Sequence, residues 1–190
     1  MNSQRVTILN GSLESDDRCD QLAALLRDRL FAEAWEVVVH RPDSMQIAPC
    51  LGCFGCWVKT PGECVIDDDA RGIARDVVQS DLVVYLTPIV FGGYSATLKS
   101  AMDRLIPLIM PYFARVRGEV HHVKRYARYP RVLGIGLLPY PDPDQEELFA
   151  ALVDRSSLNM RSPKTVVRVC DRPTDDLEAG LSHAIDEVMR

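Results

Sequence analysis

The sequence lacks the features that mark membrane, secreted and nucleic-acid-binding proteins. No apolar run approaches the roughly 20 residues that span a bilayer, and stretches such as LIPLIM at 105–110 are far shorter. The N-terminal MNSQRVTILNGS has no basic stretch followed by a long apolar one, so we expect no secretory signal and a cytoplasmic location. The net charge of -5 lacks the basic excess of nucleic-acid-binding domains. We therefore expect no membrane partner and no nucleic-acid partner.

Motifs for hydrolysis are also missing. The chain has no HExxH sequence, no Walker loop and no Ser-His-Asp order, so nothing supports a hydrolase or a nucleoside triphosphatase. It has no internal repeat, low-complexity tract or linker. A chain of 190 residues with 47% hydrophobic content can bury the core of one domain. We expect a single domain over residues 1–190.

What is present is an alternation of short β-branched segments with longer amphipathic ones. The expected strands are 5–10, 36–40, 81–86, 131–138 and 164–170. The expected helices are 17–33, 69–79, 95–106, 143–159 and 174–189. Asp67–Asp69 and Ser95 are candidate caps for the second and third helices. Near-continuous apolar strands favour a parallel sheet covered on both faces, and the element order predicts a three-layer α/β fold, a doubly wound five-stranded parallel sheet of order 2-1-3-4-5.

Two segments interrupt this alternation. Residues 41–66 form a cysteine-rich loop, and residues 107–130 form a basic insertion with little periodicity. The insertion contains His121-His122, whose side chains would point in different directions in extended structure, so a surface or interface role is favoured over a shared metal ion. The insertion could attract a dinucleotide phosphate or an acidic partner, or it could dock on a second subunit, which we favour.

Two loops are expected to meet where the strand order reverses. In a sheet of order 2-1-3-4-5, ligands bind beyond the carboxyl ends of strands 1 and 3, which here continue into residues 10–19 and 87–95. Asn10-Gly11-Ser12 leads into a helix N-terminus, where free N–H groups favour an anion. An ordinary capped turn would use the same residues.

The second loop has features suited to a flat ligand. Pro88 fixes the backbone after the strand, and Gly92-Gly93 allow close approach of a ring. Phe91 and Tyr94 could flank that ring, although either could instead cover the edge of the core. Together the two loops predict a ligand site at the switch point of the sheet.

Three stretches carry a resemblance to a known family. They are NGS at 10–12, CLGCFGCWVKTPGECVIDDD at 50–69 and TPIVFGGYSATLKSAMDRLIP at 87–107. On these stretches the chain resembles the NAD(P)H-dependent FMN reductase branch of the flavodoxin-like superfamily, and more specifically the iron–sulfur flavoproteins. The resemblance covers roughly the first 110 residues.

The resemblance implies an FMN whose phosphate lies on the first loop and whose isoalloxazine ring lies along residues 88–92. The residues implied to contact the cofactor are Asn10, Gly11, Ser12, Arg18, Cys19, Thr87, Pro88, Ile89, Val90, Phe91 and Gly92. No catalytic residue is assigned by the motif.

Three positions depart from the family pattern. Cys19 stands where the family has a hydroxyl or amide side chain, Glu14 where it often has a basic one, and Val90 where it often has Tyr. Acidic residues within 14–17 oppose a phosphate dianion, unless Arg18 compensates or they face solvent in the first helical turn. A flavodoxin-like module that has lost FMN is therefore one alternative.

Four of the six cysteines are clustered. Cys50, Cys53, Cys56 and Cys64 have the spacing C-x2-C-x2-C-x7-C, and compact four-thiolate sets hold iron–sulfur clusters. Structural zinc usually takes two separated pairs, and disulfides need oxidising conditions. Thiols with no metal are equally open from the spacing. The resemblance implies a 4Fe-4S cluster beside the flavin.

The expected function is that of an FMN-dependent NAD(P)H oxidoreductase, with a 4Fe-4S cluster as a possible electron relay. It would act on a small-molecule electron acceptor and assemble as a homodimer or homotetramer. The alternative from another class is a ferredoxin-linked electron carrier without a substrate of its own. In either case the flavin supplies the chemistry and the protein supplies position and electrostatics.

Overall fold

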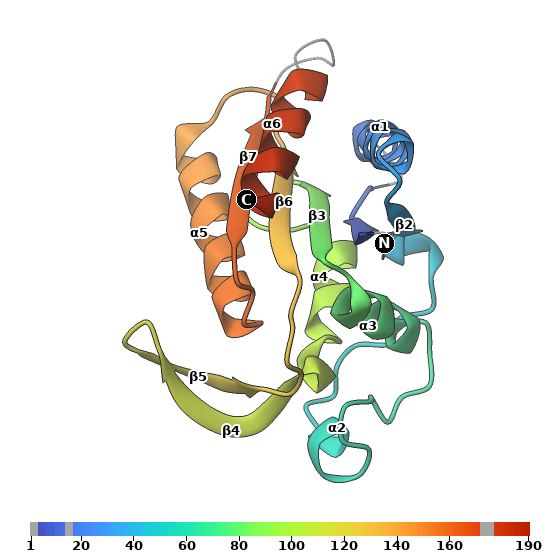
Figure 1. Ribbon diagram of the computed structural model, residues 1–190, viewed down its shortest axis with the longest axis vertical. Coiled ribbons are helices and arrows are strands. Elements are labelled where there is room, and N and C mark those ends of the chain that lie inside the picture. Colours follow the sequence, from blue (N-terminus) through green and yellow to red (C-terminus); the bar gives the residue numbers. More distant parts are fainter. Residues whose placement is uncertain (1–3, 14–16, 172–176) are drawn as a thin grey trace.

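The computed structural model describes residues 4–13, 17–171 and 177–190 and contains one five-stranded parallel sheet. Its strands are β1 (Arg5–Asn10), β2 (Glu36–His40), β3 (Leu82–Pro88), β6 (Arg131–Leu137) and β7 (Thr165–Cys170). They lie in the order β2-β1-β3-β6-β7, and every neighbouring pair is parallel (Figure 1). Counted along the sheet strands alone, this is the predicted order 2-1-3-4-5.

Helices cover both faces of the sheet and bury two separate cores. The helices are α1 (Arg18–Ala32), α3 (Ala70–Gln79), α4 (Ala96–Asp103), α5 (Pro143–Asn159) and α6 (Leu177–Met189). Ile8 faces the core formed by α1 and α6, whereas its neighbour Leu9 faces the core formed by α3, α4 and α5. Adjacent strand residues point to opposite faces, so β1 supplies both cores, as a doubly wound sheet requires.

The expected helices form close to their predicted bounds. Ser95 caps α4, because its Oγ accepts a hydrogen bond from the Leu98 N–H at 3.3 Å. At the start of α3, the N–H of Ala70 donates instead to Asp68 Oδ1 at 3.1 Å. The predicted start of the last helix, at 174–176, lies outside the described residues.

The basic insertion contains regular structure that the sequence did not predict. After the 3-10 turn η2 (Ile106–Leu108), the chain forms the antiparallel pair β4 (Ile109–Val116) and β5 (Glu119–Lys124). The connecting residues Arg117 and Gly118 both have positive φ, 51° and 84°, which is the conformation of a tight two-residue hairpin turn. Figure 1 shows the hairpin projecting from the end of the molecule opposite to α1 and α6.

The two histidines of the hairpin face different surroundings, as expected for neighbours on a strand. His121 Nε2 lies 2.8 Å from Glu119 Oε2, and His122 Nδ1 lies 2.8 Å from the Met110 carbonyl oxygen. Within the described part of the chain, no helix combines the length and apolar character needed to cross a membrane.

Candidate functional site

The two loops at the switch point touch each other, as the sequence predicts. The Gly11 N–H donates to the Leu86 carbonyl oxygen at 2.7 Å. A Cβ atom at Gly11 would lie only 2.7 Å from both Leu98 Cβ and Ser95 Oγ. Only glycine therefore allows the loop after β1 to approach the loop after β3 this closely.

Asp20 organises the first loop and was not anticipated from the sequence. Asn10 Nδ2 donates to Asp20 Oδ1 at 2.6 Å, and Ser12 Oγ donates to Asp20 Oδ2 at 3.1 Å. The Ser12 N–H also donates to Asn10 Oδ1 at 3.1 Å. Arg41 Nη1 lies 3.3 Å from Asp20 Oδ2 and offsets part of its charge. The only sequence signal was an acidic residue in the first turn of a helix, where the dipole favours it.

The start of α1 offers backbone groups rather than the Cys19 side chain to a ligand. Cys19 is 1% exposed and packs in the core beside β1. Asp17 precedes the helix and makes no side-chain cap hydrogen bond. Arg18 crosses to the carboxyl end of β6, where its Nη1 donates to the Leu138 carbonyl oxygen at 3.1 Å. The predicted acidic neighbours at 14–16 lie outside the described residues.

The second loop is a tight, well-fixed turn. Val90 and Gly93 exchange two backbone hydrogen bonds of 3.0 and 2.9 Å, with Phe91 and Gly92 at the tip and φ angles of 49° and 74°. A Cβ atom at Gly92 would lie 2.3 Å from Leu148 Cδ2. The turn is thus held against α5 and requires glycine at its second tip position.

The side chains of this loop divide into buried anchors and an exposed tip. Thr87 is fully buried; its Oγ1 accepts from the Ser95 N–H and donates to the Pro88 carbonyl oxygen, both at 2.9 Å. Phe91 is 96% exposed. Tyr94 instead packs edge-to-face against Phe149 in the core, and burial raises the pKa of its hydroxyl to about 12. Of Phe91 and Tyr94, only Phe91 is therefore accessible to the ring of a ligand.

The four clustered cysteines line one cavity of about 100 Å³ in the predicted cysteine-rich loop. The loop contains η1 (Pro42–Ser44) and the one-turn helix α2 (Gly55–Val58), which begins after Phe54 in a left-handed conformation, φ 56°. Asp103, Arg104 and Gly52 also line the cavity, and its remaining wall is apolar: Leu51, Phe54, Trp57, Ile66, Ile106 and Pro107. All six cysteines lie in the described residues, and none forms a disulfide.

The thiols are close enough to influence one another. Cys56 is buried, Cys64 half-buried, and Cys50 and Cys53 exposed. The pKa of the Cys56 thiol is raised, first by burial and then by the neighbouring Cys64, Cys50 and Cys53. A thiolate at any one position therefore disfavours ionisation of Cys56 in the absence of a cation.

Arg104, at the end of α4, ties the two ends of the cysteine loop together. Its guanidinium binds both oxygens of Asp68, at 2.7 and 2.9 Å, and also donates to the carbonyl oxygens of Ala48 and Ile66. Cys64 also lines the cavity beside this guanidinium. Burial alone would raise the pKa of Asp68. The hydrogen bonds and charge of Arg104, together with backbone hydrogen bonds, lower it by more, so the net shift of this pKa is downward. The predicted helix cap Asp68 thus also fixes the thiol site.

The donor set of the cysteine cavity consists of four thiols. Among the residues described, no three His, Cys, Asp or Glu side chains are placed to hold one ion together. Four thiols around a small apolar cavity, with a buried guanidinium beside Cys64, fit the ligands of an inorganic iron–sulfur core, which surround it from several sides.

The two parts of the site lie at opposite ends of α4. The flavin-type loop 87–95 precedes its first residue, Ala96, whereas Arg104 and the cysteine cavity follow its last, Asp103. Eight helical residues correspond to a rise of about 12 Å. The resemblance implies a cluster beside the flavin; in this chain the loop 87–95 and the cysteine cavity lie at the two ends of α4.

The fold and the loop pair at its switch point define a flavodoxin-like α/β protein. The sequence pattern of the family described as NADPH-dependent FMN reductase matches residues 4–122. The chain belongs to this family. The match ends in the hairpin and includes both loops and the cysteine segment.

Curated relatives match part of the chain. An iron-sulfur flavoprotein of Methanocaldococcus jannaschii is 41% identical over 87 residues, which are 44% of this chain and 44% of that protein. An iron-sulfur flavoprotein of Archaeoglobus fulgidus is 32% identical over 102 residues, 54% of this chain and 45% of the relative. The matched segments thus cover less than half of each relative's length.

Solved structures show the same fold along the whole chain. An NAD(P)H:quinone oxidoreductase from Methanothermobacter marburgensis superposes with a TM-score of 0.68 at 13% identity, covering 96% of each chain. An azoreductase from Bacillus anthracis superposes with a TM-score of 0.63 at 12% identity, and the superposition covers 98% of this chain and 97% of the azoreductase chain. At such identities the similarity is one of architecture.

Proposed function

We propose that this chain is an FMN-dependent NAD(P)H oxidoreductase. The observation that carries the proposal is the close approach of Gly11, after β1, to Leu86 at the end of β3 and to Ser95 in the following loop, in a chain of the FMN reductase family. Ligands of doubly wound sheets bind at this place. When bound, FMN would accept a hydride from NAD(P)H and pass the electrons to a small-molecule acceptor.

The residues of the two loops would hold and orient the cofactor. Backbone N–H groups at the start of α1 would bind the phosphate. Gly11, which has no side chain, lets the loop after β1 lie close against β3 and leaves room for the ring. The buried Thr87 fixes the backbone of the second loop, along which the ring would lie. Phe91 would cover one face of the ring.

We further propose that Cys50, Cys53, Cys56 and Cys64 hold a 4Fe-4S cluster. Their shared cavity supports this assignment, as do the relatives named iron-sulfur flavoproteins. The cluster would supply one-electron transfer, while Arg104 would hold the loop and balance part of the thiolate charge. Clustered reduced thiols also fit a cytoplasmic setting.

The proposed assembly is a homodimer or homotetramer. The hairpin exposes three large apolar side chains, Tyr112, Phe113 and Val120, each at least 64% exposed, and exposed apolar patches mark interaction surfaces. An assembly could also bring the flavin loops of one chain near the cysteine site of another.

One anaerobic experiment tests the cofactor assignments together. The purified chain is incubated with FMN, iron and sulfide, desalted, and its visible spectrum and iron and sulfide contents are measured. We expect bound flavin, bleaching of that flavin by NADH or NADPH, and loss of iron but not of FMN in Cys53→Ala. The control Cys170→Ala changes a cysteine outside the cavity and should retain iron. A chain that takes up no FMN would contradict the proposal.

A ferredoxin-linked electron carrier is the second candidate, favoured by the exposure of Cys50 and Cys53 at the surface of the thiol site. Stopped-flow reduction separates the two functions. Rapid bleaching of the flavin by NAD(P)H supports the oxidoreductase, whereas reduction by reduced ferredoxin alone supports the carrier.

A further inference from the structure

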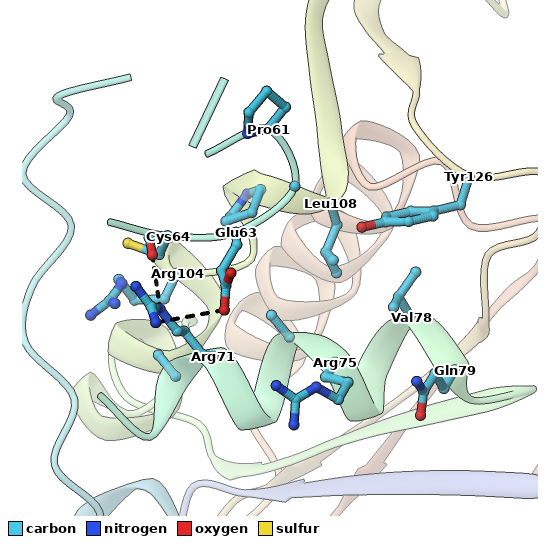
Figure 2. A pocket seen from close by; sticks show the side chains of 14 residues that line it. Pro61, Glu63, Cys64, Arg71, Arg75, Val78, Gln79, Arg104, Leu108 and Tyr126 are labelled. Carbon is cyan, nitrogen blue, oxygen red and sulfur yellow. Dashed lines mark hydrogen bonds and ion pairs between the residues drawn. The ribbon is translucent and has the colours of Figure 1, made fainter. Parts of the chain in front are cut away.

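A second, larger cavity lies beside the cysteine site and away from the flavin-type loops. Its volume is about 420 Å³, and its walls come from α3, residues 61–64, the segment around Pro107 and Tyr126 beyond β5. Figure 2 shows Leu108 and Tyr126 opposite helix α3, with Val78 on the side of the helix toward them and Arg75 and Gln79 along its other edge. None of the residues predicted to contact FMN lines it. It shares Cys64, Arg104 and Pro107 with the cysteine-lined cavity.

Three arginines and one acid, Glu63, line this cavity, and carboxylates pair with two of the three arginines. Arg104 is balanced by Asp68, at 2.7 Å. Arg71 lies 3.6 Å from Glu63 and 2.9 Å from Asp67, and its Nε donates to the Cys64 carbonyl oxygen (Figure 2).

Arg75 is the remaining cation. It is exposed, and no carboxylate in the described part of the chain lies within ion-pair distance of it. It follows Arg71 by one helical turn on α3, so both side chains lie on one face of the helix. A guanidinium in this position can form two parallel hydrogen bonds with a carboxylate, sulfonate or phosphate.

The wall also contains apolar side chains and one aromatic ring, beside the amide of Gln79. Val78, Leu108 and Tyr126 face the cavity beyond the arginines (Figure 2). The volume of this cavity is within the range of small-molecule sites, about 300–1,000 Å³.

We propose that this cavity binds a small organic anion with a planar apolar body. The anionic group pairs with Arg75, and the body lies between Val78, Leu108 and the ring of Tyr126. The occupant then rests against the wall formed by Cys64 and Arg104, next to the thiol site. The proposal goes beyond the proposed function, because binding here requires neither FMN nor a cluster.

Calorimetric titration of the full chain with 2-naphthoate tests the site. We expect saturable one-to-one binding that Arg75→Gln weakens about tenfold, the effect of losing a charged hydrogen-bond partner. Arg115→Gln is the matched control, since it removes the same charge from an exposed position on the hairpin, and it should leave the affinity unchanged. The neutral analogue 2-naphthalenemethanol should bind at least tenfold more weakly. Tyr126→Ala should weaken both probes.

Three outcomes would overturn the proposal: no saturable binding, equal losses in Arg75→Gln and Arg115→Gln, or equal affinities for the two probes. The titration is repeated on the chain saturated with FMN. Unchanged affinity for 2-naphthoate supports two separate sites, whereas displacement by FMN contradicts the placement. An FMN titration of Arg75→Gln should match that of the unmodified chain, so failure at this cavity is distinguishable from failure of the flavin assignment.

Discussion

Replacement of Arg104 by Met should destabilise the protein strongly, although the residue lies in no predicted flavin contact. The side chain of Arg104 is 1% exposed and that of its partner Asp68 10% exposed. Removing one member of a buried ion pair leaves an uncompensated charge and costs about 3–5 kcal/mol. The carbonyl oxygens of Ala48 and Ile66 also lose their donor, which places the expected cost toward the upper part of that range.

Urea unfolding followed by far-UV circular dichroism measures this cost. At a slope of about 2 kcal/mol per molar urea, a loss of about 4 kcal/mol lowers the midpoint by about 2 M. The control is Lys99→Gln, which breaks the ion pair with Asp103 on the exposed face of the same helix; exposed pairs of this kind contribute about 0.5 kcal/mol or less.

A double-mutant cycle isolates the pair itself. Asp68→Asn removes the charge that Arg104→Met leaves behind, so the double variant should be more stable than the sum of the two single losses predicts, by at least about 1 kcal/mol. Additive losses, or a loss from Arg104→Met no larger than that from Lys99→Gln, would refute the role assigned to this pair.

The pH dependence of the same measurement has a definite sign. The folded-state pKa of Asp68 is lowered, so its contribution to stability is present above the unfolded-state pKa, near 3.9, and is lost as pH falls through the folded-state value. The stability difference between the unmodified chain and Arg104→Met should therefore shrink below about pH 4. A difference that stays constant to pH 2 would contradict the ion pair as its source.

Three further predictions concern the two loops and the hairpin. Phe91→Ala should weaken FMN binding about five- to tenfold by removing an aromatic face. The control Phe31→Ala removes an exposed aromatic side chain from α1 and should leave FMN binding unchanged. Equal effects of the two substitutions in a fluorescence titration would exclude Phe91 from the site. Asp20→Asn should tighten FMN binding about threefold, because a carboxylate near a phosphate dianion costs on the order of 0.6 kcal/mol in water. Weaker binding would show that the hydrogen bonds of Asp20 matter more than its charge. Gly118→Ala should reduce the free energy of unfolding by about 1 kcal/mol, because alanine is strained at the positive φ of this position. The urea midpoint should fall accordingly, and an unchanged midpoint would show that the turn relaxes at no cost.

The alternation of apolar strands and amphipathic helices was sufficient to predict the sheet order, because the central strands β1, β3 and β6 are buried on both faces. Ile8 and Leu9 illustrate this: both are fully buried, in different cores. The position of the loops at 10–12 and 87–95 followed from the same topology. These parts of the structure depend on local patterns that a sequence displays directly.

Contacts between distant side chains could not be predicted in the same way. Asp68 was anticipated only as a helix cap, since nothing in its local sequence indicates a guanidinium 36 positions later. Asp20 was missed because its partners, Asn10 and Ser12, were themselves assigned to the phosphate. The hairpin was missed because its strands mix charged and apolar residues without strict alternation, and its Arg117-Gly118 turn is a weaker signal than Asn-Gly.

The two segments that interrupt the alternation prove to be one structural unit. Trp57 Nε1, from the cysteine loop, donates to the Ile109 carbonyl oxygen at the start of β4 at 2.9 Å. Its ring lies between Phe54, stacked at 5.3 Å, and His122 of β5, at 5.1 Å, and His122 in turn contacts Phe113 at 4.8 Å. A continuous row of rings therefore joins the thiol site to the exposed face of the hairpin. A partner on this face would bury Phe113, whose ring contacts His122 and through it Trp57 at the cysteine cavity. We therefore expect such binding to alter the environment of the thiols.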